Sequence, residues 1–268
     1  MLGIGWTSRV MGMLIPAIFA GHLAAAEPAQ LPAKEKFHLY LLIGQSNMAG
    51  RGVVEEQDKT PHPRVLTLTK EQTWAPAVDP IHFDKPIAGV GLGTTFGRVL
   101  AEADPAATIG LVPCAVGGTP LSRWQKGGDL YKQAVARIKF AMEHGTLRGI
   151  LWHQGENDSA REEAAKTYGE RLAGMIGDLR VELGAGDVPF VAGELGRFLA
   201  KTDKEGQPSY WPLVNEQLAA LPKSVPNVAV VSSEGLKAKS DNVHFDSAAL
   251  REFGRRYAAA MQKLQQGK

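Results

Sequence analysis

The chain has 268 residues, of which 44% are hydrophobic and 22% are charged, and its formal net charge is +2 with histidine neutral. This length fits one α/β domain, and so balanced a charge without a Lys/Arg block gives no basis for nucleic-acid binding. The single cysteine, Cys114, excludes an intramolecular disulfide, and its place in an apolar run predicts a small buried side chain rather than a reactive thiol.

The first 26 residues have the pattern of a secretory signal peptide. Arg9 precedes an apolar stretch at 11–20, and the alanines at 24–26 supply an A-x-A-like cleavage site. The apolar stretch is shorter than the ~20 residues of a membrane span. We therefore expect a signal peptide at 1–26, a linker at 27–35, and an exported protein, periplasmic or secreted, with no stable membrane insertion after cleavage. An uncleaved N-terminal membrane anchor is the alternative.

Five short apolar runs follow, each bounded by Gly, Pro or polar residues, as is typical of strands buried on both faces. They span 37–44, 107–116, 148–155, 188–195 and 227–233. Amphipathic helical segments separate them or close the chain, at 94–104, 129–145, 159–184, 211–221 and 247–265. The alternation predicts a five-stranded parallel sheet with helices on both faces, in the flavodoxin-like order 2-1-3-4-5.

Local signals mark the ends of some of these segments. Ser159, with Glu162 three residues later, predicts a capping box at the start of the helix at 159–184. Asp246 is expected to cap the last helix. The stretch 46–93, rich in Pro and polar residues, is long for a connection, which is typical of functional loops.

Polar residues follow the first, second, third and fifth predicted strands, whose ends meet at one edge of a parallel sheet, where ligands bind. Ser46 is a weak nucleophile that needs a base, which His244 would supply, and Asp241 would orient the imidazole. The anionic intermediate of such a reaction needs hydrogen-bond donors. The candidates for this oxyanion hole are the backbone N–H groups of Ser46, Gly117 and Gly118 and the side-chain amide of Gln154 or Asn157.

Four motifs carry a resemblance to a known family. They are "GQSNMAG" (44–50), "AVGGTPLSRW" (115–124), "WHQGEND" (152–158) and "DNVHF" (241–245). In this order they resemble the SGNH hydrolases, and more narrowly the sialate O-acetylesterase-like group that includes carbohydrate esterase family six, the acetylxylan esterases. The resemblance covers about residues 36–262. It implies a three-layer α/β/α sandwich, with an SGNH-type esterase catalytic domain at 36–268.

The resemblance also implies roles for single residues. Ser46 corresponds to the nucleophile, His244 to the base, and Asp241, three residues earlier, to the acid that orients the imidazole. Ser46 is not on a G-x-S-x-G elbow, which argues against an ordinary α/β-hydrolase. The mechanism of such esterases requires no cofactor, and no His/Cys/Asp spacing in the sequence is typical of a metal site.

Two assignments in the third motif stay open. The block at 155–158 matches the superfamily's G-x-N-D, in which the asparagine, here Asn157, donates to the oxyanion. The narrower "WHQGE" context instead favours Gln154, which we prefer at this point. Glu156 is an alternative to Asp241 as the acid, or a member of the surrounding network.

The predicted function is a serine esterase that removes acetyl groups from a plant-type polysaccharide such as acetylated xylan through an acetyl-enzyme. A sialate O-acetylesterase is the rival enzyme, because the loops at 52–92 and 197–210 would set the sugar pocket and their sequences do not decide. A catalytically inactive carbohydrate-binding protein on the same fold is the rival from another class. Trp124 is either a sugar-stacking platform or a residue of the core or of a lid.

Overall fold

The computed structural model describes residues 1–5, 31–202 and 206–267. The apolar stretch and cleavage site of the expected signal peptide, and the first part of the linker, lie outside the described residues. The chain divides into two units, Met1–Gln30 and Leu31–Lys268, and the fold described below is that of the second. Among the described helices, none combines the length and the apolar character needed to cross a membrane.

Seven strands form one sheet in the order β3-β2-β4-β1-β5-β6-β7. Neighbouring strands are parallel except β2 and β3, which are antiparallel. The α/β class is confirmed, and the five predicted strands keep the flavodoxin-like order as β4-β1-β5-β6-β7. The strands are β1 (Phe37–Gly44), β2 (Val65–Leu68), β3 (Trp74–Pro76), β4 (Thr108–Pro113), β5 (Thr146–His153), β6 (Phe190–Gly193) and β7 (Val228–Val231).

The expectation of five strands is wrong, because β2 and β3 extend the sheet at one edge. Both lie in the 46–93 stretch that the composition predicts to be a loop. With four and three residues they are too short to show a clear alternation or a continuous apolar run. Pro76 is tolerated in β3 because β3 is an edge strand.

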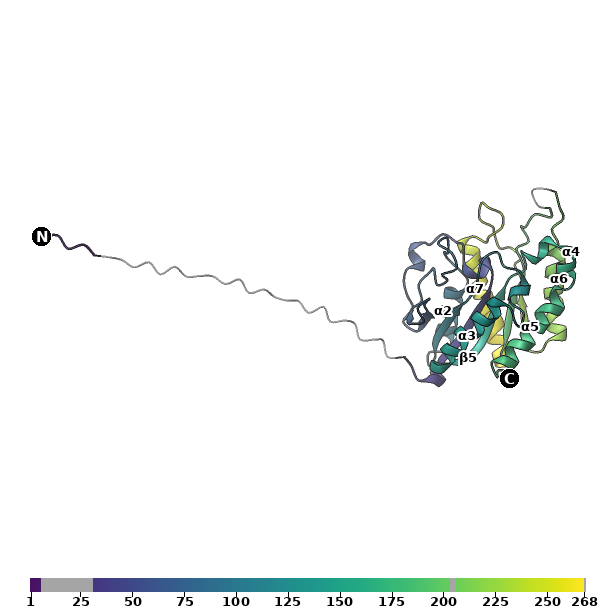
Figure 1. Cartoon of the computed structure of the whole chain (residues 1–268), viewed down its shortest axis with the longest axis horizontal. Helices are drawn as coiled ribbons and strands as arrows, with labels where there is room; N and C mark the ends of the chain where they lie inside the picture. Colours follow the sequence, from purple (N-terminus) through teal and green to yellow (C-terminus); the bar gives the residue numbers. More distant parts are fainter. Residues whose placement is uncertain (6–30, 203–205, 268) are drawn as a thin grey trace. The chain divides into compact units, whose positions relative to one another are not determined.

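Helices cover both faces of the sheet (Figure 1). The helices α2 (Gly93–Ala103) and α7 (Ser247–Gln266) pack on one face. On the other face lie α3 (Asp129–His144), α5 (Tyr168–Glu182) and α6 (Trp211–Ser224). Shorter helices are η1 (Lys34–Lys36), α1 (Ser46–Ala49), η2 (Glu56–Asp58), η3 (Leu121–Arg123), η4 (Asp158–Ala160) and α4 (Glu162–Lys166).

The central strand β1 shows why the sheet is buried on both sides. Its odd-numbered apolar residues from Phe37 to Ile43 belong to the core under α3, and Tyr40 and Leu42 belong to the core under α2. Successive side chains of a strand point to opposite faces, so a continuous apolar run fills both cores. This packing holds the carboxyl end of β1 rigidly between its neighbours.

The helix predicted at 159–184 is interrupted, which corrects that expectation. The stretch is divided between η4, α4 and α5. Ser159 forms no capping box, because its Oγ donates to the carbonyl of Glu156 at 2.8 Å and so fastens the loop after β5. By contrast, the Asp246 side chain accepts the N–H of Ala249 and caps α7 as predicted.

Candidate active site

Ser46 follows β1 at the carboxyl edge of the sheet. Gly44, with φ at 136°, makes the turn possible, since a Cβ on it would lie 2.1 Å from the carbonyl oxygen of His153. The N–H of Gln45 donates to that same oxygen at 2.9 Å. Helix α1 then begins at Ser46, which is 8% exposed. The close approach of β1 and β5 thus fixes where the serine hydroxyl lies.

Ser46, His244 and Asp241 form a chain of hydrogen bonds. The Nε2 atom of His244 lies 3.0 Å from Ser46 Oγ, and its Nδ1 atom lies 2.9 Å from Asp241 Oδ2. Asp241 Oδ1 accepts the backbone N–H groups of Val243 and His244, each at 2.9 Å. The loop between β7 and α7 therefore brings an imidazole to the serine hydroxyl, an arrangement that can make the serine a nucleophile.

The environment of Asp241 keeps its carboxyl group ionised. Partial burial raises its pKa, but hydrogen bonds from the backbone N–H and the ring of His244 and from the N–H of Val243 outweigh this and lower the pKa to about 2. The carboxylate is therefore negative in neutral solution and can stabilise a protonated His244 imidazole.

Glu156 lies in an adjoining network and forms no hydrogen bond or ion pair with His244 among the described residues. Its Oε1 atom accepts the side-chain amide of Asn47 at 2.6 Å and lies 3.6 Å from Nε2 of the fully buried His153. Burial raises the pKa of Glu156, but His153 and the bond from Asn47 outweigh this and lower it below its usual value. The acid that touches the imidazole of His244 is thus Asp241.

Gly117 lies against another side of Ser46, and Gly118 follows it in the chain. A Cβ on Gly117 would lie 2.5 Å from Arg51 Nη2 and 3.4 Å from Ser46 Cβ. The N–H of Gly117 donates to Asp84 Oδ2 at 2.8 Å, so it is not available to an oxyanion, which corrects that expectation. In the described part of the chain, the N–H groups of Ser46 and Gly118 meet no hydrogen-bond acceptor.

Gln154 and Asn157 differ in what their amides already bind. Gln154 is fully buried, and its Nε2 donates to Gln45 Oε1 (3.2 Å), Thr119 O (3.0 Å) and Asp158 Oδ2 (2.7 Å). Asn157 is exposed and donates one amide hydrogen to the carbonyl of Gly118 at 3.1 Å, which leaves its second hydrogen without an acceptor among the described residues. Among the described residues, Gln154 thus fastens the loops together and has no amide hydrogen left for an oxyanion, against our preference for it, whereas Asn157 has one.

An ion pair beneath the site is not foreseen from the sequence. Arg51 and Asp84 are both buried and lie 2.6 Å apart, and Arg51 also donates to the carbonyl of Gly50 at 2.7 Å. Through Asp84 this pair holds the backbone of Gly117 against Ser46. The two charges are separated by 33 positions inside the long stretch before α2, and no local pattern indicates that they pair.

Trp124 belongs to the interior, and Cys114 is partly buried. Trp124 is 1% exposed, contacts Trp152 edge to face at 5.7 Å and donates from its indole to Thr119 Oγ1, so it is not a sugar-stacking platform. Cys114 packs against the core, and burial raises the pKa of its thiol to about 12. Such a thiol is not ionised in neutral solution and is a poor nucleophile.

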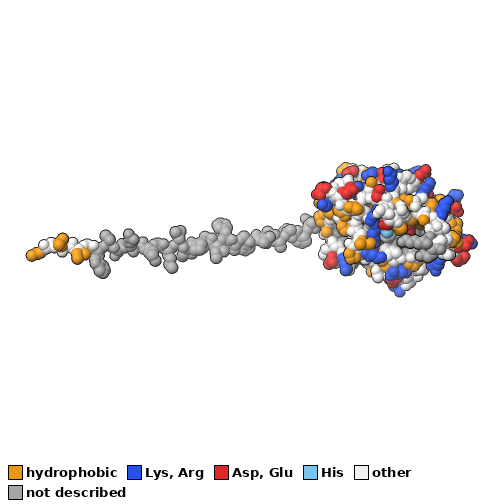
Figure 2. Space-filling model, turned by 90° about the horizontal axis from the view of Figure 1, so that it is seen from above, with side chains coloured by type: hydrophobic (Ala, Val, Ile, Leu, Met, Phe, Trp, Pro, Cys, Tyr) orange, Lys and Arg blue, Asp and Glu red, His pale blue; other side chains and the backbone are white. Residues whose placement is uncertain are grey.

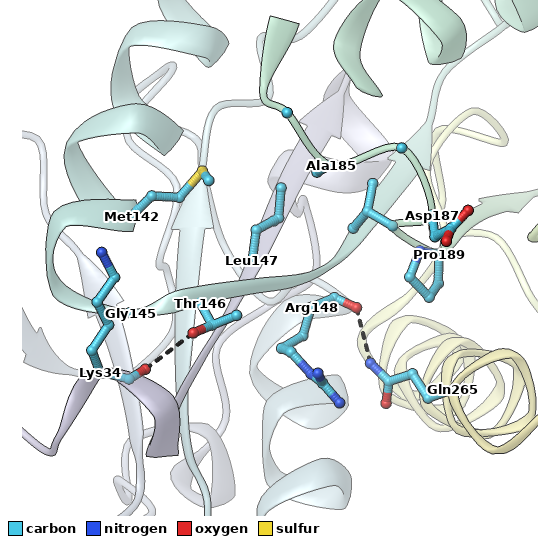
Figure 3. Close-up of a pocket in the computed structure, with 13 residues that line it drawn as sticks. Lys34, Met142, Gly145, Thr146, Leu147, Arg148, Ala185, Asp187, Pro189 and Gln265 are labelled. Carbon is cyan, nitrogen blue, oxygen red and sulfur yellow. Dashed lines mark hydrogen bonds between the residues drawn. The ribbon is translucent and has the colours of Figure 1, made fainter. Parts of the chain in front are cut away.

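A cavity of about 480 Å³ lies at the amino ends of β5 and β6 (Figure 3). Its lining includes Met142, Leu147, Arg148 and Gln265. Since β5 has eight residues and a strand rises ~3.3 Å per residue, this cavity is roughly 23 Å from the carboxyl edge. It therefore takes no part in the site around Ser46.

The surface and the described side chains add two observations. On the described part of the face in Figure 2, Lys and Arg are interspersed with Asp and Glu, so it carries no patch of a single charge sign. Among the described residues, no group of three or more His, Cys, Asp or Glu side chains could hold a metal ion.

The chain is similar to known carbohydrate esterases. A family model described as "Carbohydrate esterase, sialic acid-specific acetylesterase" matches residues 36–263. The curated "Probable carbohydrate esterase At4g34215" of Arabidopsis thaliana is 33% identical over 243 residues, which are 83% of this chain and 89% of that protein. The X-ray structure of that Arabidopsis protein has a TM-score of 0.76 at 30% identity, and the match covers 85% of this chain and 98% of the other.

Two further solved structures share the fold. NanS has a TM-score of 0.73 at 18% identity, over 89% of this chain and 100% of its own. XAC1771, a carbohydrate acetylesterase from Xanthomonas citri, has a TM-score of 0.66 at 21% identity, over 87% of this chain and 57% of its own. The family match spans all four motifs and nearly the whole unit that carries the site. The chain therefore belongs to the carbohydrate esterase family of sialic acid-specific acetylesterases.

Proposed function

We propose that this protein is a serine esterase that removes acetyl groups from carbohydrate, with Ser46 as its nucleophile. The observation that carries the proposal is the hydrogen-bonded chain from Ser46 through His244 to Asp241. Membership of a carbohydrate esterase family supports an ester on a sugar as the bond that is cleaved.

The reaction proceeds in two halves. Ser46 Oγ attacks the acetyl carbonyl carbon while His244 Nε2 takes the hydroxyl proton. The tetrahedral intermediate then collapses, the sugar oxygen leaves with the proton from His244, and an acetyl group remains on Ser46. Water next gives a proton to His244 and attacks the acetyl-enzyme, and acetate leaves as the serine is restored. Asp241 holds the imidazole in the required tautomer throughout.

Three donors would stabilise the intermediate's oxyanion. They are the backbone N–H groups of Ser46 and Gly118 and the side-chain amide of Asn157, each with a hydrogen free of other acceptors among the described residues. Donors fixed before the reaction need no reorganisation when charge develops on the substrate oxygen, and losing one typically costs ~10²–10³ in rate.

Acetylated xylan or a similar neutral polysaccharide is the substrate we favour over O-acetyl sialic acid. Arg51, the cation packed against Gly117 beside Ser46, is buried and paired with Asp84. Its charge is therefore not offered to the carboxylate of a sialic acid. The family's description keeps the sialate ester as the second candidate. The intact Ser46–His244–Asp241 chain argues against an inactive binding protein.

Residues 1–26 would act as a signal peptide and direct the protein out of the cytoplasm. Expression of the whole chain in a bacterial host, followed by N-terminal sequencing of the exported product, tests this. A mature chain beginning near Glu27 is expected, and a retained N-terminus would contradict export by cleavage.

The central test compares wild type with Ser46→Ala in release of acetate from an aryl acetate. The variant is expected to lose activity by ~10⁴-fold or more, because the covalent step is removed. Equal hydrolysis by both proteins would overturn the mechanism. Acetylated xylan and O-acetyl sialic acid, offered to the wild type under the same conditions, then decide the substrate.

A further inference from the structure

Asn47, the residue after Ser46, forms hydrogen bonds to the backbone on both sides of His244. Its Oδ1 accepts the N–H of Phe245 at 3.1 Å, and its Nδ2 donates to the carbonyl of Val243 at 3.3 Å. Asn47 is 1% exposed; its bond to Phe245 is buried, and its bond to Val243 is partly buried. Two adjacent residues thus meet the same loop, Ser46 at the imidazole of His244 and Asn47 at the backbone around it.

Two other contacts of this loop act within it. Asp241 and the N–H of Lys239, which donates to the carbonyl of His244 at 2.7 Å, orient the imidazole within its own loop. They do not set how far that loop lies from Ser46. The bonds of Asn47 reach across from the residue beside Ser46. Lys239 Nζ, which donates to the carbonyl of Arg51 at 2.7 Å, and the buried ring of Phe245, which packs against His153, also anchor the loop.

Glu156 sets which way the amide of Asn47 points. A side-chain amide can be turned end for end with little change of shape, so its partners must select the orientation. The Nδ2 of Asn47 donates to Glu156 Oε1 at 2.6 Å, a short bond typical of an ionised acceptor. Turned the other way, the amide oxygen would face the carboxylate, and the amide nitrogen would face the N–H of Phe245.

We propose that Asn47, oriented by Glu156, is a positioning residue that sets the separation between Ser46 Oγ and His244 Nε2. This inference rests on the proposed function, because it matters only if His244 is the base for Ser46. A displacement of ~1 Å of a reacting group can cost 10²-fold in rate, so a buried clamp on the histidine loop acts on the chemical step.

The test is Asn47→Ala, assayed with an aryl acetate. We expect kcat to fall by ~10²-fold while KM changes little, because Asn47 moves the base and does not bind the substrate. The matched control is Asn215→Ala. Asn215 grips the backbone of Leu195 in the same way, with bonds of 2.7 and 3.1 Å to its N–H and carbonyl, and holds no proposed catalytic group. The control is expected to lose thermal stability and to keep its kcat.

A double-mutant cycle tests the part played by Glu156. Glu156→Gln can present an amide instead of a carboxylate oxygen to Asn47, so kcat should fall by less than in Asn47→Ala. The double variant should match Asn47→Ala, because Glu156 acts through Asn47. If the loss of kcat in the double variant were the product of the two single losses, this part of the inference would be overturned.

Two outcomes separate this inference from the proposed function. If Ser46→Ala is inactive and folded Asn47→Ala keeps kcat within about threefold of wild type, the positioning role is overturned and the function stands. An equal loss of kcat in Asn215→Ala would also overturn it, since the effect would then be one of general packing. If Ser46→Ala keeps full activity, the proposed function itself fails.

Discussion

The two edges of the sheet differ in how their polar groups are used. At the carboxyl edge, the loops after β1, β5 and β7 bind one another through side chains that are nearly buried, such as Gln45, Asn47 and Gln154. At the amino edge, a cavity of about 480 Å³ is bordered mainly by bonds from side chains to backbone carbonyls, such as those from Gln265 to Arg148 and from Arg180 to Val188. In this molecule, the candidate site is therefore marked by a network of hydrogen bonds and not by a large cavity.

This difference has a physical cause. A transition state that develops charge is stabilised best by dipoles already held in place, and holding them requires a surrounding network. Gln154 and Asp158 provide such a network beneath the candidate donors, and the Arg51–Asp84 pair does so beneath Gly117. The predictions that follow test the carboxyl edge first and the amino edge last.

After the loss of Ser46 itself, the largest effect is expected for Asp241→Asn. The amide can still accept the N–H groups of the turn, but its NH₂ group cannot accept the proton on His244 Nδ1, so the imidazole takes the wrong tautomer. We expect kcat for an aryl acetate to fall by ~10⁴-fold with the melting temperature little changed. A loss below about tenfold would remove Asp241 from the mechanism.

A smaller effect distinguishes Asn157 from Gln154. Asn157→Ala should lower kcat by ~10²–10³-fold and leave stability unchanged, since an exposed oxyanion donor is lost. Gln154→Ala should instead lower the free energy of unfolding, because it leaves buried acceptors such as Asp158 Oδ2 short of a donor at ~1–3 kcal/mol each. Kinetics and urea unfolding measure the two effects. If Gln154→Ala lost kcat and Asn157→Ala lost stability, Gln154 would be the oxyanion donor instead.

Asp79 is a buried carboxyl group that the proposed chemistry does not use, so its titration should affect stability and not catalysis. Burial raises its pKa to about 7, while a hydrogen bond from Thr94 opposes the rise. Because the folded state holds this proton more tightly than the unfolded state, its stabilising contribution is present below pH ~4 and is lost as pH rises through about 7. The free energy of unfolding, measured with urea, should therefore fall by a few kcal/mol between pH 5 and 8, and this fall should be smaller in Asp79→Asn. Equal pH dependence in both proteins would contradict the raised pKa.

No effect on catalysis is expected from Arg148→Ala. Arg148 lines the cavity at the amino edge, and the length of β5 separates it from Ser46. The variant should keep the kcat and KM of the wild type for an aryl acetate. A loss comparable to that of Asn157→Ala would show that the two edges are coupled and would break the comparison.

Much of this arrangement could be predicted from the sequence, because it depends on local patterns and on one topological rule. The apolar runs that became β1, β4, β5, β6 and β7 are continuous, and the polar residues of the motifs follow them directly. Parallel strands bring their carboxyl ends together, so Ser46 and His244 are expected to meet although they are 198 positions apart.

The rest depends on packing between distant segments. Gly117 gives its N–H to Asp84, and Gln154 is enclosed by Gln45 and Thr119, and neither arrangement has a local signature. The motif resemblance therefore favoured Gln154 as the oxyanion donor, although its amide hydrogens are already bound, over the exposed Asn157. The strands β2 and β3 were missed because each has too few residues to show a period.

The most direct measurement is labelling with a fluorophosphonate, which reacts with serines activated as nucleophiles. The account predicts one label per chain, found by peptide mass spectrometry on Ser46, and a loss of acetyl ester hydrolysis in proportion to the labelled fraction. Labelling should be absent in Ser46→Ala and greatly slowed in Asn47→Ala. Full activity after complete labelling, or a label on another residue, would contradict the claim that Ser46 is the nucleophile at the carboxyl edge of the sheet.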